Sequence, residues 1–174
     1  MTKIISLIIL QALFCFTFFP LSHSANSLIE STCTKTPFPD LCISTLKSDP
    51  RSSTADVSGL ALIVADSVNA EAMATLNQIS TLLKSATDPN MKKALSGCVD
   101  SYNTIIKADI PVAIDAIEKK NPKYAVDSAT DAGDEAQRCE GSFRGNSANS
   151  PISGSNKAVH DLSVILRSIA SLLL

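Results

Sequence analysis

Residues 56–85 read DVSGLALIVADSVNAEAMATLNQISTLLKS, and this stretch decides the fold class. Its apolar residues recur at steps of three and four positions, which is the period of one face of an α-helix. They are Val57, Leu60, Ala61, Val64, Val68, Ala72, Leu76, Ile79, Leu82 and Leu83. The stretch therefore predicts a long amphipathic helix whose apolar face lies in a protein core.

Two further helix starts carry the same local signal. Asp88-Pro89 and Asn121-Pro122 each combine an N-cap residue with a proline at the first helical position. The helix that follows Pro89 contains Pro111, which removes one backbone hydrogen bond. We therefore expect a bend at Pro111 rather than two separate helices.

The last two helices differ in the size of their inner faces. The helix after Pro122 turns small residues inward, and a final helix from about Ser155 to Leu173 turns larger ones inward. The first set is Ala125, Ala129, Ala132, Ala136, Cys139 and Phe143; the second is Val159, Leu162, Ile165, Leu166, Ile169 and Leu172. Residues 141–154 read as a loop, and no strand-like alternation of useful length occurs.

The predicted fold is all-α, an up-down-up-down four-helix bundle with an N-terminal helical hairpin extension. Residues 25–55 form the extension, and residues 56–174 form the bundle. The chain has 174 residues, which suits one domain after a leader is removed. Its 15 basic and 17 acidic residues leave no basic field for a nucleic acid, and its 45% hydrophobic content excludes a disordered chain.

The N-terminus has the layout of a secretory signal peptide. Lys3 precedes an apolar run over residues 4–19, which Pro20 ends, and Ser22 and Ser24 supply small residues before a cut after Ser24. A membrane anchor is the alternative, but the run is shorter and more interrupted than a membrane span requires. Residues 1–24 are therefore predicted to be removed, and the product is predicted to enter the secretory pathway without remaining in a membrane.

Four cysteines remain once Cys15 leaves with the leader: Cys33, Cys42, Cys98 and Cys139. An even number in an oxidising compartment predicts two disulfides. Of the three possible pairings, a local bridge between Cys33 and Cys42 is the easiest, but the sequence alone does not choose. A zinc site is the alternative, and the cysteine spacing does not match common zinc ligands.

The chain offers little material for catalysis, so we predict that it is not an enzyme and holds no metal or cofactor. His160 is the one histidine of the mature chain, and its neighbour Asp161 is expected to point away from it on a helix. Asp127, Asp131 and Glu135 share a helix face at intervals of four, which predicts a solvated acidic face. No phosphate loop, nucleophile elbow or metalloprotease motif occurs.

One segment between two predicted helices is a candidate binding site: Lys119-Lys120-Asn121-Pro122-Lys123-Tyr124. Lys119 and Lys120 suit a helix C-terminus, which favours cations. Lys123 does not suit its place, because the second position of a helix disfavours positive charge. A proline-started corner that presents Lys123 beside the aromatic Tyr124 suits insertion into an acidic pocket of another protein.

Five short stretches together carry a resemblance to a known protein family. They are CTKTPFPDLC (33–42), LKSDPRS (46–52), DVSGLA (56–61), ALSGC (94–98) and AQRCE (136–140). In these stretches and their spacing, residues 25–174 resemble the plant invertase and pectin methylesterase inhibitor family. The resemblance implies a four-helix bundle with an N-terminal helical hairpin and the pairings Cys33–Cys42 and Cys98–Cys139.

The resemblance also indicates a target. Invertase-directed members of the family resemble one another in a Pro-Lys-Phe tripeptide at the start of the third bundle helix, and Pro122-Lys123-Tyr124 occupies that place here. This implies a secreted inhibitor of plant acid invertase, a glycoside hydrolase, with Tyr124 in place of Phe. The alternatives are an inhibitor of pectin methylesterase that docks through a bundle face, and a secreted helical protein without an inhibitory target.

Overall fold

The computed structural model of this chain describes residues 19–144 and 149–174, and every regular element within them is helical. The elements are α2 (Phe19–Cys33), α3 (Pro39–Ser48), η1 (Pro50–Ser53), α4 (Val57–Ser85), α5 (Pro89–Thr104), η2 (Ile105–Asp109), α6 (Ile110–Glu118), α7 (Pro122–Gly141) and α8 (Ser153–Ser171). The predicted all-α class is confirmed. Most of the predicted leader, residues 1–18, lies outside the described residues.

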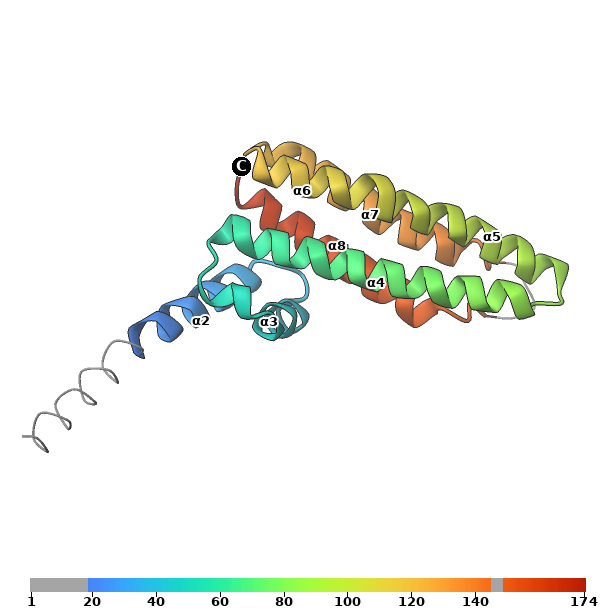
Figure 1. The fold of residues 1–174 in the computed structure, drawn as a ribbon, viewed down its shortest axis with the longest axis horizontal. Helices are drawn as coiled ribbons and strands as arrows, with labels where there is room; N and C mark the ends of the chain where they lie inside the picture. Colours follow the sequence, from blue (N-terminus) through green and yellow to red (C-terminus); the bar gives the residue numbers. More distant parts are fainter. Residues whose placement is uncertain (1–18, 145–148) are drawn as a thin grey trace, which may run out of the picture.

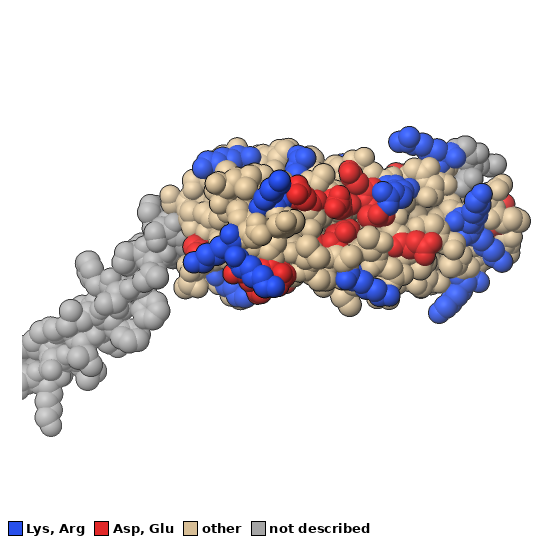
Figure 2. Space-filling view, turned by 90° about the horizontal axis from the view of Figure 1, so that it is seen from above, with Lys and Arg blue, Asp and Glu red and all other residues tan. Residues whose placement is uncertain are grey.

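The long helices run side by side and form an elongated body (Figures 1 and 2). α4 forms one rod, α5, η2 and α6 form the second, and α7 and α8 form the third and fourth. The helices α2 and α3 pack as a hairpin at the end of the body where α4 begins (Figure 1). The corner between α6 and α7 lies at this same end, and the turn between α4 and α5 lies at the opposite end. The predicted bundle with its extension is confirmed.

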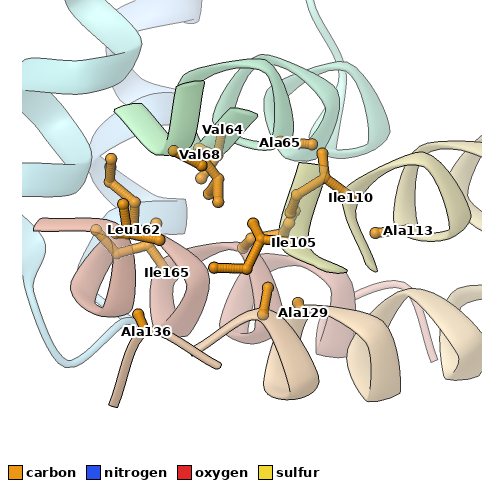
Figure 3. Packing of buried hydrophobic residues seen from close by; sticks show 14 of the residues in the cluster. Val64, Ala65, Val68, Ile105, Ile110, Ala113, Ala129, Ala136, Leu162 and Ile165 are labelled. Carbon is orange, nitrogen blue, oxygen red and sulfur yellow. The ribbon is translucent and has the colours of Figure 1, made fainter. Parts of the chain in front are cut away.

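The core combines large side chains from three rods with small ones from α7. Figure 3 shows Val64 and Val68 of α4 and Ile165 of α8 pointing into this core, and Ala129 of α7 pointing toward Ile105. The predicted inner alanines of α7 are all buried: Ala125, Ala129, Ala132 and Ala136. An alanine face buries little area but allows close approach of neighbouring helices, so α7 packs tightly between them.

Among the described helices, α4 has the length and apolar composition that could cross a membrane. Its apolar residues have another use, because four of them are fully buried in the bundle core: Leu60, Val64, Val68 and Ile79. The hydrophobicity of α4 is therefore explained by packing within the bundle.

The second rod contains a π turn where the sequence predicts a bend. At η2 the backbone N–H of Ile110 donates to the carbonyl of Ile105, five residues earlier. Pro111 has no N–H for the carbonyl of Lys107, and its ring would crowd that carbonyl in an α-helix. The wider π turn changes the hydrogen-bond register just before the proline, so the rod continues into α6 without a break.

The hairpin is fastened internally and to the bundle. Cys33 and Cys42 form one disulfide with their Cα atoms 5.5 Å apart, and Cys98 and Cys139 form the other at 4.5 Å, which confirms the implied pairings. Arg51 of η1 lies 2.8 Å from the Asp66 carboxylate of α4. The first disulfide therefore closes the hairpin, the second joins α5 to α7, and the Arg51–Asp66 ion pair connects the extension to α4.

Candidate target-binding corner between α6 and α7

The corner, residues 119–124, begins with a tightly hydrogen-bonded helix end. The backbone N–H of Lys120 donates to the carbonyl of Ile117 at 3.1 Å, and that of Asn121 donates to Ala116 at 2.8 Å. This pair of bonds is the Schellman arrangement, which satisfies the carbonyls at a helix C-terminus. The direction in which the chain leaves α6 is therefore set by the backbone itself.

Lys120 adopts the conformation that this arrangement requires. Its φ is 56°, and it is the one non-glycine residue with positive φ among the residues that the structure describes. Residues other than glycine avoid this left-handed region because their Cβ crowds the backbone, at a cost of about 1 kcal/mol. Sequence analysis assigned Lys120 only a favourable charge and missed its backbone role. The signal was available, since Pro122 forces the helix to end within two residues of Lys119.

The start of α7 lacks the side-chain cap that the sequence predicts. Pro122 occupies the first helical position, as expected, but the side chain of Asn121 makes no capping hydrogen bond. The prediction of an Asn121 cap is wrong because Asn121 has φ −119° and ψ 63°, outside the extended region that a capping residue normally adopts. The first turn of α7 also contains no acidic residue. The positive end of the helix dipole is therefore left without a compensating anion.

Lys123 and Tyr124 project from this uncapped start. Lys123 is exposed and forms no ion pair with any residue in ranges 19–144 and 149–174, Asp127 included, whereas Lys119 lies 2.8 Å from Asp115. The Asp115 carboxylate raises the pKa of Lys119. Tyr124 is 58% exposed, although the other tyrosine, Tyr102, is fully buried with its hydroxyl 2.8 Å from Asn156.

The arrangement combines three features that suit an acidic pocket with apolar surface at its mouth. Lys123 supplies a full charge, the start of α7 supplies a partial positive charge, and Tyr124 supplies an apolar face that is not used within the protein. The buried Ala125 anchors the next turn, so the backbone beneath these side chains is fixed. The corner can therefore fill an acidic pocket of another protein with little loss of conformational freedom.

The surroundings of His160 differ from the prediction. Its Nδ1 lies 3.1 Å from the Asp161 carboxylate, and its Nε2 lies 2.6 Å from the Gln137 amide. The expectation that His160 and Asp161 point apart is wrong, because the His160 ring and the Asp161 carboxylate are in direct contact. Since the Gln137 amide donates to one ring nitrogen and Asp161 accepts from the other, the trio joins two helices, with no nucleophile in it.

The predicted acidic face of α7 is also more than a solvated surface. Glu135 is 9% exposed and forms an ion pair with Arg138. Beside them lies Asp109 of η2, whose Oδ2 is buried without a hydrogen-bond partner among the described residues. The pKa of Asp109 is raised to about 6, mainly by burial and then by the nearby Asp131 and Glu135 carboxylates, while Arg138 opposes the shift. No sequence signal pointed to Asp109, because its burial depends on how η2 packs against α7.

The described residues contain no group of three or more His, Cys, Asp or Glu side chains placed to hold a metal ion. The four cysteines are all committed to disulfides, so they offer no thiolate ligands.

The fold, the two disulfides and the exposed corner together define a class of small helical inhibitor. The chain belongs to the plant invertase/pectin methylesterase inhibitor family, which it matches over residues 27–170. The resemblance drawn from the sequence is thereby confirmed, and the family is one of inhibitors rather than enzymes.

Individual relatives include both branches of the family. The chain is 46% identical over 146 residues to the cell wall / vacuolar inhibitor of fructosidase 1 of Arabidopsis thaliana, covering 84% of this chain and 69% of that protein. It is 34% identical over 126 residues to the pectinesterase inhibitor of Actinidia deliciosa, covering 72% and 68%. The crystal structure of a mutant form of an Arabidopsis pectin methylesterase inhibitor superposes with a TM-score of 0.71 at 26% identity, covering 82% of this chain and 94% of that one.

Proposed function

We propose that this protein is a secreted inhibitor of plant acid invertase that blocks the sucrose site with Pro122, Lys123 and Tyr124. The observation that carries the proposal is the exposed Lys123, without an ion pair among the described residues, at the uncapped start of α7. The relative at 46% identity, named as an inhibitor of fructosidase, supports the choice of target.

The mechanism follows from the charge of the target. A retaining glycosidase carries two carboxyl groups in its pocket, one a nucleophile and one a general acid. Lys123 would pair with these groups, and the partial positive charge of the α7 start would add to the attraction. Pro122 would set the angle of insertion, and Tyr124 would cover apolar surface at the pocket mouth. Sucrose would be excluded without any bond being cleaved.

Pectin methylesterase is the second candidate target, since a relative at 34% identity is named a pectinesterase inhibitor. This function would use a face of the bundle rather than the corner, because the corner is built to meet carboxylates in a narrow pocket. The two targets are therefore distinguished by whether the corner residues matter.

The proposal includes secretion. Removal of residues 1–24 would deliver residues 25–174 to the cell wall or the vacuole, and the relative named for both compartments supports this destination. N-terminal sequencing of the product from the host plant should begin at Ala25 or within a residue or two of it. A product that retains Met1 and sediments with membranes would contradict this part of the proposal.

The decisive experiment replaces Lys123. Lys123→Ala should weaken inhibition of invertase by roughly 30-fold or more, because truncating one partner of a desolvated charge pair costs about 2–5 kcal/mol. Inhibition constants against acid invertase and pectin methylesterase provide the measurement. The midpoint temperature of thermal unfolding should be unchanged or slightly higher, since Lys123 opposes the helix dipole.

Lys120→Ala is the matched control, since Lys120 also forms no ion pair with a described residue and alanine keeps a Cβ at the same backbone conformation. It should change inhibition little. Equal inhibition by Lys123→Ala and the parent protein would remove the corner from the mechanism and place pectin methylesterase first.

Tyr124→Phe tests what the hydroxyl contributes. If the hydroxyl is buried in the complex without a partner, its removal will tighten inhibition; if it donates a hydrogen bond to the enzyme, its removal will weaken inhibition. Both the inhibition constant and the dissociation rate report the difference.

A further inference from the structure

A second surface feature lies at the opposite end of the bundle from the corner. It is a cleft of about 400 Å³ between the first turns of α5 and the segment that follows α7. Its lining residues are Asn90, Lys93, Ala94, Gly97, Ser142 and Arg144. We refer to it as the basic cleft.

The walls of the basic cleft are held in place by a covalent link. The disulfide between Cys98 and Cys139 joins α5 to α7 directly beneath it, with the two Cα atoms 4.5 Å apart. Gly97 lies opposite Ser142 in the cleft, and a Cβ at Gly97 would be in ordinary van der Waals contact with the Ser142 hydroxyl at 3.5 Å. A larger side chain would fill the cleft.

The charge around the basic cleft is opposite to that of the whole protein. Lys93 and Arg144 line it, and Lys84 and Lys92 are near these residues in the sequence. Asp88 is the one acidic residue in ranges 84–97 and 141–144, whereas the full chain has a net charge of −2. Figure 2 shows several Lys and Arg side chains at the end of the body away from the hairpin, although others lie at the hairpin end. None of the four cations forms an ion pair with a residue in the described ranges.

One of these lysines is also in a costly place. Lys92 is the fourth residue of α5, in the first turn, where the helix dipole disfavours cations. Asp88, the nearest acidic residue in the sequence, already accepts a hydrogen bond from the Met91 N–H at 2.9 Å. An external anion would offset this unfavourable interaction.

The surroundings restrict the kind of anion. The exposed large hydrophobic residues among those described are Met73, Val112, Tyr124, Leu172 and Leu174, and none of them lines the basic cleft. Protein interfaces and amphipathic membrane contacts typically include such apolar anchors. The cleft instead places the Asn90 amide and the Ser142 hydroxyl among spread cations, which suits a hydroxyl-rich chain with repeated charges.

We propose that the basic cleft binds the carboxylates of an acidic polysaccharide of the polyuronate type. Lys93 and Arg144 would pair with carboxylates inside the cleft, Lys84 and Lys92 would meet neighbouring carboxylates along the chain, and Asn90 and Ser142 would bind sugar hydroxyls. Because the cleft and the corner lie at opposite ends of the body (Figure 1), the protein can be retained on an extracellular matrix while the corner stays free.

The test is retention of the full protein, purified as secreted, on immobilised polygalacturonate at mildly acidic pH and low salt. The double variant Lys92→Gln/Lys93→Gln should elute at a clearly lower salt concentration and bind roughly tenfold more weakly. The control variant Lys35→Gln/Lys107→Gln has the same net charge, removes two exposed lysines far from the cleft, and should elute with the parent protein.

Three outcomes would overturn the proposal. The parent protein could pass through the column, both double variants could elute together, or fully methyl-esterified polygalacturonate could retain the protein equally well. Elution by inorganic phosphate at a much lower ionic strength than by chloride would instead identify a phosphate site. Invertase inhibition by both double variants provides a separate readout, so a failure of the proposed inhibitory function does not affect the result of the retention test.

Discussion

The helices α5 and α7 begin with the same kind of sequence and end up in opposite situations. Asp88-Pro89 starts α5, and the Asp88 carboxylate accepts a hydrogen bond from the Met91 N–H at 2.9 Å. Asn121-Pro122 starts α7, and Asn121 makes no such bond. The third helical residue is half-buried Met91 in α5 but Tyr124, 58% exposed, in α7.

This difference separates a start that serves stability from one that we propose serves binding. The α5 start satisfies its own backbone and packs its third residue against the core. The α7 start follows a left-handed Lys120, has no side-chain cap and leaves Tyr124 exposed. Departures from good local structure are expected where a surface has been shaped for a partner. The predictions below change one helix start or the elements that hold it, and the largest expected effect comes first.

The largest effect on stability should come from the disulfide that joins the two compared helices. Cys98→Ser/Cys139→Ser should lower the free energy of unfolding by about 4 kcal/mol, because this bridge closes a long loop. Cys33→Ser/Cys42→Ser should cost about 2.5 kcal/mol, since its loop is shorter. Urea unfolding of the two variants tests the order. A larger loss for the short loop would show that the hairpin, not the α5–α7 link, limits stability.

The next largest effect on stability should come from the ionisation of Asp109. This residue lies in η2, on the rod that leads to α7. Its folded-state pKa is raised to about 6, above the ordinary value of 3.8. Between these values the folded protein holds a proton that the unfolded chain has lost. The free energy of unfolding should therefore fall as the pH rises through this window, and the loss should be complete above about pH 6.

Asp109→Asn should remove this loss and raise the free energy of unfolding near pH 7 by about 1–3 kcal/mol. Urea unfolding of both proteins from pH 4.5 to 8 provides the measurement. The exposed Asp127→Asn on α7 is the control and should keep the pH dependence of the parent protein. An identical pH dependence in Asp109→Asn and the parent would show that Asp109 is ionised in the folded protein without cost.

The two caps themselves should differ in a direct comparison. Asp88→Ala should destabilise the bundle by about 1 kcal/mol, because it leaves the Met91 N–H without its carboxylate acceptor. Asn121→Ala should change stability by less than about 0.3 kcal/mol, since no side-chain cap is lost. Thermal unfolding of both variants under one condition suffices. Equal losses would mean that Asn121 caps α7 in solution.

The smallest effect should come from Lys120. Lys120→Gly removes the crowding at φ 56° but gives the unfolded chain more freedom, so a net stabilisation of about 0.5 kcal/mol is expected. The comparison variant Asn90→Gly, near the α5 start, should be destabilising because its backbone is helical. A destabilised Lys120→Gly would show that the lysine side chain contributes more to the helix end than its backbone strain costs.

Much of this protein was determined by the sequence itself. The apolar period over residues 56–85 predicted α4, the proline dipeptides predicted the starts of α5 and α7, and the inner alanines of α7 were identified residue by residue. Local patterns succeed here because a bundle places consecutive helices against one another, so each amphipathic face finds its partner nearby. The corner residues Pro122, Lys123 and Tyr124 were singled out in the same way, from a cation placed against a helix dipole.

Other features were decided only by tertiary structure. The burial of Asp109 and the contact between His160 and Gln137 depend on how rods separated in sequence pack side by side. The basic cleft likewise requires the Cys98–Cys139 bridge to bring Lys93 and Arg144 together. The physical reason is common to all of them. Burial, backbone strain and electrostatic field at a residue are set by neighbours that its own stretch of sequence does not contain.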